Sequence, residues 1–250
     1  CWSRQTYTYR NSICQGFVLI VSIGNNLIGY FPNDYLIFTS LFSMSSYQDI
    51  AGAFKKKKFS PIYWLQGEES FFMDKLMHMA EHELLNETEA SFNLTVFYGK
   101  DADWSNVINA CRKHPMFGTF QVVVLKEAQM MRDLVKLEPY IQQPLATTVF
   151  VVTYKGKHPD KRTGFFKALQ KQAEVFDSAK LRDDKIQPWI EEQVSERSCT
   201  IDKKAAAMIA DFIGNDLSRI VTELDKLLIN KKGNQHITAA DVEEQIGISR

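Results

Sequence analysis

Pro-Ile-Tyr-Trp-Leu-Gln-Gly-Glu-Glu-Ser-Phe-Phe-Met-Asp, residues 61–74, is the stretch that decides the fold of this chain. Residues 61–66 are mostly aromatic and aliphatic, which is typical of a buried strand. Gly67 ends that strand, and Glu68 and Glu69 open a helix, because carboxylates suit the positive end of a helix dipole. A strand that leads through a tight turn into a helix is the repeating unit of a parallel α/β sheet.

The same alternation continues along the chain. Further strands are expected at residues 92–98, 121–125, 148–153 and 175–176, with helices at 103–111, 131–142 and 161–172. Repeated strand–helix units predict one parallel sheet with helices on both of its faces. From about Leu181 the strands are expected to stop. A bundle of three or four helices is predicted there, at residues 186–196, 203–213, 217–230 and 239–246.

Residues 1–43 differ from the rest. They carry only three charges, Arg4, Arg10 and Asp34. Their apolar run is much shorter than the roughly 20 residues that span a bilayer. We therefore expect Met44 to be the biological start and residues 1–43 to be a translated upstream segment, with a membrane anchor as the alternative. The expected organisation is this segment, then an α/β domain at 44–180 and a helical domain at 181–250.

The overall charge of the chain does not favour non-specific binding of nucleic acid. The 250 residues contain 30 Lys and Arg and 30 Asp and Glu, so the formal net charge is zero and there is no global field to attract phosphates. Basic residues do cluster at 55–58 and again at Lys155, Lys157, His158, Lys161 and Arg162. Each cluster is either a solvated face or a phosphate contact. The four cysteines show no CxxC spacing, which indicates neither a zinc site nor a disulfide framework.

An enzyme of this fold class would carry its chemistry in the strand–helix turn. A phosphate-binding loop needs several glycines, a Lys and a Ser or Thr for Mg²⁺. Here the turn is Gly67-Glu68-Glu69-Ser70, with one glycine and two carboxylates that would repel a triphosphate. The strand at 121–125 ends without an Asp-Glu pair, and HExxH and GxSxG motifs are missing from the sequence. We therefore expect no catalytic residues, no metal and no cofactor.

Met116 and Phe117, called the apolar pair below, stand between an expected helix and a buried strand. They follow Pro115, and Gly118 lets the backbone turn sharply after them. The pattern predicts two large apolar side chains on an exposed corner, where they would serve only if a partner offers a pocket. The alternative is that the pair packs under the next strand as core.

Three stretches together resemble one known family. The first is the strand and turn at 63–74, and the second is Pro115-Met116-Phe117-Gly118 ahead of a hydrophobic strand. The third is Gly-Asn-Asp-Leu-Ser-Arg-Ile at 214–220, continuing to Glu-Leu-Asp-Lys-Leu at 223–227. In this order they are similar to the delta subunit of the bacterial DNA polymerase III clamp loader.

The resemblance implies an AAA+-like α/β domain and a small helical lid domain, without ATPase activity of its own. The family opens the ring-shaped sliding clamp by inserting two adjacent apolar residues between clamp domains. These map onto Met116 and Phe117, flanked by Pro115 and Gly118. The first is usually Leu, for which Met is an easy substitute. A Gln often found upstream corresponds to Arg112, so the outer contacts of the family are not carried over.

The resemblance also implies partners and a location. The partners are the sliding clamp (beta), the gamma or tau and delta prime subunits, and primed DNA, all in the cytoplasm and away from the membrane. Lys155, Lys157, Lys161 and Arg162 are candidates for contact with DNA inside that assembly. The family's third, helical collar domain is expected to be missing, because the chain ends at Arg250.

Two other functions stay open. One is a divergent AAA+ nucleotide hydrolase that binds ATP through an unrecognised loop. The other is a nucleic-acid-binding module that uses both basic clusters against phosphates, which would make binding depend steeply on salt.

Overall fold

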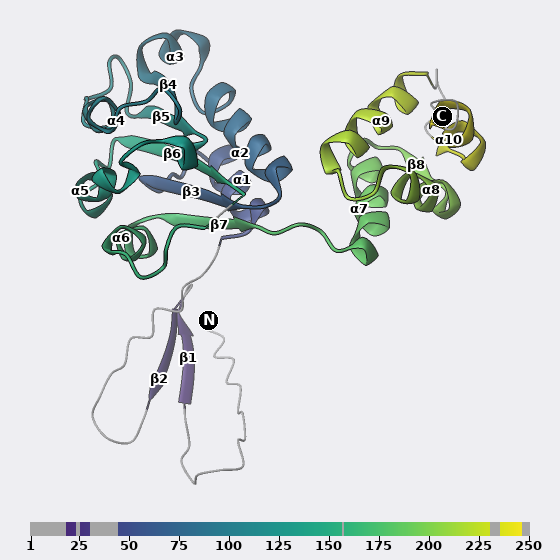
Figure 1. Ribbon diagram of the computed structural model, residues 1–250, viewed down its shortest axis with the longest axis horizontal. Coiled ribbons are helices and arrows are strands. Elements are labelled where there is room, and N and C mark those ends of the chain that lie inside the picture. The colour runs from purple at the N-terminus through teal and green to yellow at the C-terminus, as the bar shows by residue number, and fades with distance from the viewer. Residues whose placement is uncertain (1–18, 24–25, 31–44, 157, 231–235, 247–250) are drawn as a thin grey trace, which may run out of the picture. The chain divides into compact units, whose positions relative to one another are not determined.

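The computed structural model describes residues 19–23, 26–30, 45–156, 158–230 and 236–246 (Figure 1). The chain divides into two units, residues 1–45 and residues 46–250. In the first unit, β1 (Leu19–Ile23) and β2 (Asn26–Tyr30) pair as an antiparallel hairpin.

The second unit is built on a five-stranded parallel sheet with the order β4-β5-β6-β3-β7. In register, Trp64 of β3 lies opposite Val152 of β6 on one side and Val175 of β7 on the other. All six residues of β3 are buried, which explains why its sequence is mostly apolar rather than alternating. The strands are β3 (Ile62–Gly67), β4 (Leu94–Tyr98), β5 (Gln121–Lys126), β6 (Thr148–Lys155) and β7 (Glu174–Ser178).

Helices cover both faces of this sheet (Figure 1). Because successive strand residues point to opposite faces, Tyr63 and Leu65 join one core with α1 and α2, whereas Ile62 and Trp64 join the other with α4, α5 and α6. The predicted α/β architecture is confirmed. The helices are α1 (Tyr47–Lys55), α2 (Ser70–His82), α4 (Trp104–Cys111), α5 (Glu138–Gln142) and α6 (Gly164–Gln172).

After β7 the chain is mainly helical. The predicted helices are present as α7 (Asp183–Glu196), α8 (Lys203–Ile213), α9 (Leu217–Asn230) and α10 (Ala239–Ile246). Their apolar faces form a third core that includes the fully buried Ile190, Ile209 and Leu224. The expectation that strands stop after Leu181 is wrong, because β8 (Thr200–Ile201) and β9 (His236–Ile237) pair in parallel. Two-residue strands are too short to show a periodic signal in a sequence.

Two other expectations about elements are corrected. Within the range 131–142, where one helix was expected, the structure has the 3-10 turn η2 (Leu134–Leu137) followed directly by the short helix α5, and a further 3-10 turn, η1 (Ala128–Met130), precedes this range. Asp133 interrupts the helix because its φ is 59°, and the left-handed region cannot continue a right-handed helix.

The strand expected at 92–98 starts only at Leu94, because α3 (Glu87–Asn93) precedes it. Asn86 and Glu89 form a capping box at the start of this helix. That short motif was the available sequence signal.

Within the described residues, none of the helices combines the length and the apolar character that crossing a bilayer requires.

Candidate functional site

The apolar pair lies in residues 112–120, the loop that connects α4 to β5. Met116 is 53% exposed and Phe117 is 89% exposed. The alternative in which the pair packs under the following strand is therefore wrong. The inward side of β5 is filled without them, because residues 122–125 are themselves fully buried.

Asn93, the last residue of α3, holds this loop. Its side-chain amide donates to the carbonyl oxygen of Met116, and its amide oxygen accepts from the N–H of Met116, both at 2.7 Å. Asn93 is buried, with 2% of its surface exposed. A buried side-chain amide that both donates to and accepts from the backbone of one residue fixes the orientation of that residue.

The sheet explains why these two segments meet. Asn93 directly precedes β4 and the loop directly precedes β5. β4 and β5 are parallel neighbours, with Leu94 opposite Val122. Both segments therefore lie at the amino-terminal edge of the sheet, and the β3–α2 turn lies at the carboxyl-terminal edge.

The corner itself is strained. Phe117 has a φ of 56°, and the left-handed region costs a residue with a side chain about 1–2 kcal/mol. A Cβ at position 118 would lie 3.3 Å from the amide nitrogen of Asn93, which favours glycine there. Strain of this kind persists only where the surroundings fix it, and the hydrogen bonds from Asn93 do so here.

Phe92 extends the apolar surface. It is 56% exposed, and its ring meets the ring of Phe117 edge to face, with centroids 5.9 Å apart at 73°. Together with residues 86–89 at the start of α3, Phe92 and the apolar pair line a surface hollow of about 600 Å³.

Neither Phe92 nor Asn93 was singled out from the sequence, because both were assigned to a strand. The capping box at Asn86 was the signal that could have corrected this assignment.

Two backbone N–H groups of the β3–α2 turn are hydrogen-bonded within the chain. A Cβ at Gly67 would lie 2.3 Å from the carbonyl oxygen of Ser178, so the end of β7 fills the space beside the turn. The N–H of Glu69 donates to that same oxygen at 2.9 Å. The Glu69 carboxylate accepts from the N–H of Phe71 at 3.0 Å and thereby caps α2. In nucleotide sites such helix N-terminal donors bind phosphate, whereas here a carboxylate of the same chain occupies that place.

The other two residues of the turn offer no substitute for a phosphate-binding loop. Glu68 is exposed and carries a negative charge, and Ser70 is the first residue of α2.

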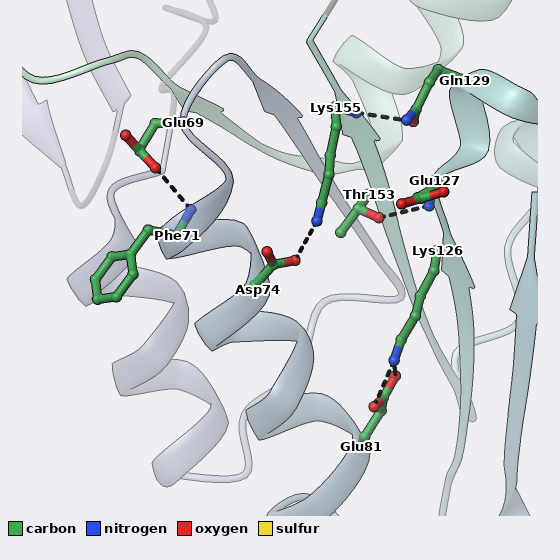
Figure 2. A network of polar contacts seen from close by, with 9 residues as sticks. All are labelled: Glu69, Phe71, Asp74, Glu81, Lys126, Glu127, Gln129, Thr153 and Lys155. Atoms are coloured by element: carbon green, nitrogen blue, oxygen red, sulfur yellow. Dashed lines mark hydrogen bonds and ion pairs between the residues drawn. The ribbon is translucent and has the colours of Figure 1, made fainter. Parts of the chain in front are cut away.

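Two ion pairs tie α2 to the strand ends beside this turn (Figure 2). Lys155, which ends β6, lies 2.6 Å from Asp74. Lys126, which ends β5, lies 2.7 Å from Glu81. Next to them, the N–H of Glu127 donates to the hydroxyl of Thr153 at 2.9 Å. The two lysines at the carboxyl ends of the central strands are thus paired with carboxylates of α2, which suits a structural role.

The basic residues considered for DNA contact do not form one cationic surface. Lys155 is the partner of Asp74, and Arg162 is paired with Asp160 at 3.0 Å. Lys161 is exposed, and Lys157 lies outside the described residues. The lysines at 55–58 precede β3 and so lie at the opposite edge of the sheet from Lys155, which ends the parallel strand β6.

The described residues do not favour metal-ligating or thiol chemistry. Across the described ranges, no group of three His, Cys, Asp or Glu residues is placed to hold a metal ion. Cys111 is a free thiol that is fully buried, and burial raises its pKa. A thiol with a raised pKa is a poor nucleophile.

The model of the family described as "DNA polymerase III, delta subunit" matches residues 63–179 of this chain. The resemblance to the delta-subunit family is confirmed. The matched range contains both the β3–α2 turn and the loop with the apolar pair.

The individual proteins that the chain matches include delta proteins of one bacterium. The chain is 24% identical over 204 residues to the DNA polymerase III subunit delta of Bacillus subtilis, covering 78% of this chain and 59% of that protein. The structure of the Bacillus subtilis DNA clamp loader delta protein overlays with a TM-score of 0.65 at 24% identity, covering 80% of this chain and 62% of that one. The chain therefore spans about three fifths of the length of these delta proteins.

The α/β domain thus shares the fold of the Bacillus subtilis clamp loader delta protein. The RuvB branch migration motor of Thermotoga maritima overlays with a TM-score of 0.47 at 16% identity, covering 80% of this chain and 65% of RuvB.

Proposed function

We propose that this delta-family chain binds the ring-shaped sliding clamp through Met116 and Phe117 and helps to open it for loading onto primed DNA. One observation carries the proposal. Two adjacent large apolar side chains stand 53% and 89% exposed at a corner that a buried asparagine fixes. Exposed apolar side chains make no favourable interaction with water, and they suit a pocket on a partner.

Opening follows from differential binding. A subunit shifts the clamp toward the open ring only if it binds the open or strained interface more tightly than the closed one. Burial of two large apolar side chains supplies on the order of 3–6 kcal/mol. That energy is sufficient to bias a strained interface, although it is insufficient to break a large interface alone.

Nucleotide energy enters through other subunits in this proposal. In the β3–α2 turn the N–H of Glu69 donates to Ser178 and the N–H of Phe71 donates to the carboxylate of Glu69. We therefore assign ATP binding to other subunits of the loader. The assembly would act in the cytoplasm, with DNA contacted mainly by the complete loader.

The test is binding of the purified chain to its cognate sliding clamp. Two anchors at the centre of an interface cost roughly 2 kcal/mol each when truncated, so Met116→Ala with Phe117→Ala should weaken binding by roughly 1,000-fold. The fold should stay intact, because both side chains are largely exposed. The measurements are the Kd by surface plasmon resonance and the unfolding midpoint by circular dichroism.

Met130→Ala with Val135→Ala is the matched control. These residues are 58% and 56% exposed and lie outside the loop of residues 112–120. The control should bind like the unmodified chain. An unchanged Kd for the Met116 and Phe117 variant would refute the proposed function.

A further inference from the structure

The apolar pair has an immediate neighbour on a different element. The last turn of α3 places Phe92 against Phe117 and Asn93 against the backbone of Met116. We propose that this turn belongs to the docking site, with Phe92 as a third apolar contact and Asn93 as the residue that positions the pair. This inference rests on the proposed function and takes the same partner, the sliding clamp.

Phe92 belongs to the docking surface because of its position. The centroids of its ring and the Phe117 ring are 5.9 Å apart, so a pocket that encloses Phe117 must also cover or displace Phe92. Phe92 is 56% exposed in the free chain, which leaves a large apolar area for a partner to cover. Aromatic side chains are over-represented among residues that dominate binding energy.

Asn93 acts through Met116 and is therefore a positioning residue. The loop of residues 112–120 is irregular until β5 begins, and an irregular loop must lose conformational freedom on binding. Two hydrogen bonds of 2.7 Å from a buried side chain remove that freedom before the partner arrives. Affinity gained in this way comes from pre-organisation, without a new contact to the partner.

The close approach at Gly118 supports the same role. A Cβ at position 118 would lie 3.3 Å from the amide nitrogen of Asn93 and 3.9 Å from a carboxylate oxygen of Glu89. The loop therefore rests directly on α3. Loss of the Asn93 amide would release Met116 and allow the left-handed corner at Phe117 to relax.

The test uses single variants and the purified cognate clamp. Phe92→Ala should weaken clamp binding by about 30-fold, as expected for loss of one anchor. Tyr98→Ala is the matched control, because Tyr98 is an aromatic residue of equal exposure (55%) that lies outside the hollow. The control should bind normally, and both variants should fold because both rings are exposed.

Asn93→Ala separates positioning from contact. It should weaken binding by about tenfold in the unmodified chain and by a clearly smaller factor in a chain that carries Phe117→Ala, because coupled residues are not additive. A merely structural role would lower the unfolding midpoint and reduce binding by the same factor in both backgrounds. That result would overturn the assignment of Asn93.

The outcomes distinguish the two proposals. If the unmodified chain binds the clamp and the Met116 and Phe117 variant does not, but Phe92→Ala binds normally, the third contact is refuted and the proposed function stands. If the unmodified chain fails to bind the clamp, both proposals are overturned.

Discussion

Gly67 shows how one residue lets the end of β7 approach the β3–α2 turn. Its φ is +126°, and an added Cβ would lie 2.3 Å from the carbonyl oxygen of Ser178. Gly67→Ala should therefore lower the free energy of unfolding by about 3 kcal/mol or more, through backbone strain and collision with a backbone atom. Urea denaturation measures this change.

Gly52→Ala is the control for that substitution. Gly52 lies inside α1, and nothing would lie within 4 Å of its new Cβ. Here alanine should stabilise the chain by about 0.5–1 kcal/mol, since glycine is a poor residue for a helix interior. Equal effects at both positions would contradict the role given to Ser178.

At the residue scale, the β3–α2 turn has one glycine, two carboxylates and no Lys followed by Ser or Thr. That this turn binds no phosphate stays a prediction. The sequence could not predict Ser178 as the partner of this turn, since that contact depends on where β7 joins the sheet. The contact of Asn93 with Met116 could not be predicted because the sequence indicates a strand at 92–98, whereas Asn93 ends α3.

At the element scale, α2 is tied to the sheet by charge as well as by its apolar face. Burial opposes the charge of Lys126, but the hydrogen bond and the charge of Glu81 outweigh it and raise the lysine pKa. A raised lysine pKa contributes stability that is present at neutral pH and is lost as pH rises through that value. The window of loss thus lies above the ordinary lysine pKa of about 10.4.

A double-mutant cycle should measure this tie. The side chains of Lys126 and Glu81 are 27% and 12% exposed, so Lys126→Met and Glu81→Gln should show a coupling free energy of about 1 kcal/mol at pH 7. The exposed pair Lys136 and Asp133, at 50% exposure each, should show about 0.3 kcal/mol. Similar couplings for both pairs would argue against a structural role for the strand-end lysine.

Long elements were predictable and short ones were not. β3 and β6 were identified because continuous apolar runs are typical of fully buried parallel strands. The seven-residue α3 and the two-residue β8 and β9 are too short for a periodic signal. The helix expected at 131–142 is present only as α5 at its end, after the 3-10 turn η2, because Asp133 leaves the right-handed region.

At the scale of the whole molecule, the alternation of strands and helices followed by helices alone predicted both the sheet and the bundle. Only the structure shows how the two edges of the sheet differ. The carboxyl-terminal edge, where α/β proteins bind ligands, is crossed by ion pairs from α2. The amino-terminal edge carries the exposed apolar pair.

This difference between the two edges predicts how the melting temperature of the whole chain responds to nucleotide. A ligand bound only to the folded chain, at 100 times its Kd, adds about 2.7 kcal/mol to the free energy of unfolding and raises the melting temperature by several degrees. Millimolar Mg-ATP should leave the melting temperature unchanged, because the donors at the start of α2 are already bound to Ser178 and Glu69. Differential scanning fluorimetry, with an ATP-binding AAA+ protein as positive control, provides the comparison. A concentration-dependent rise in the melting temperature would instead favour the nucleotide hydrolase.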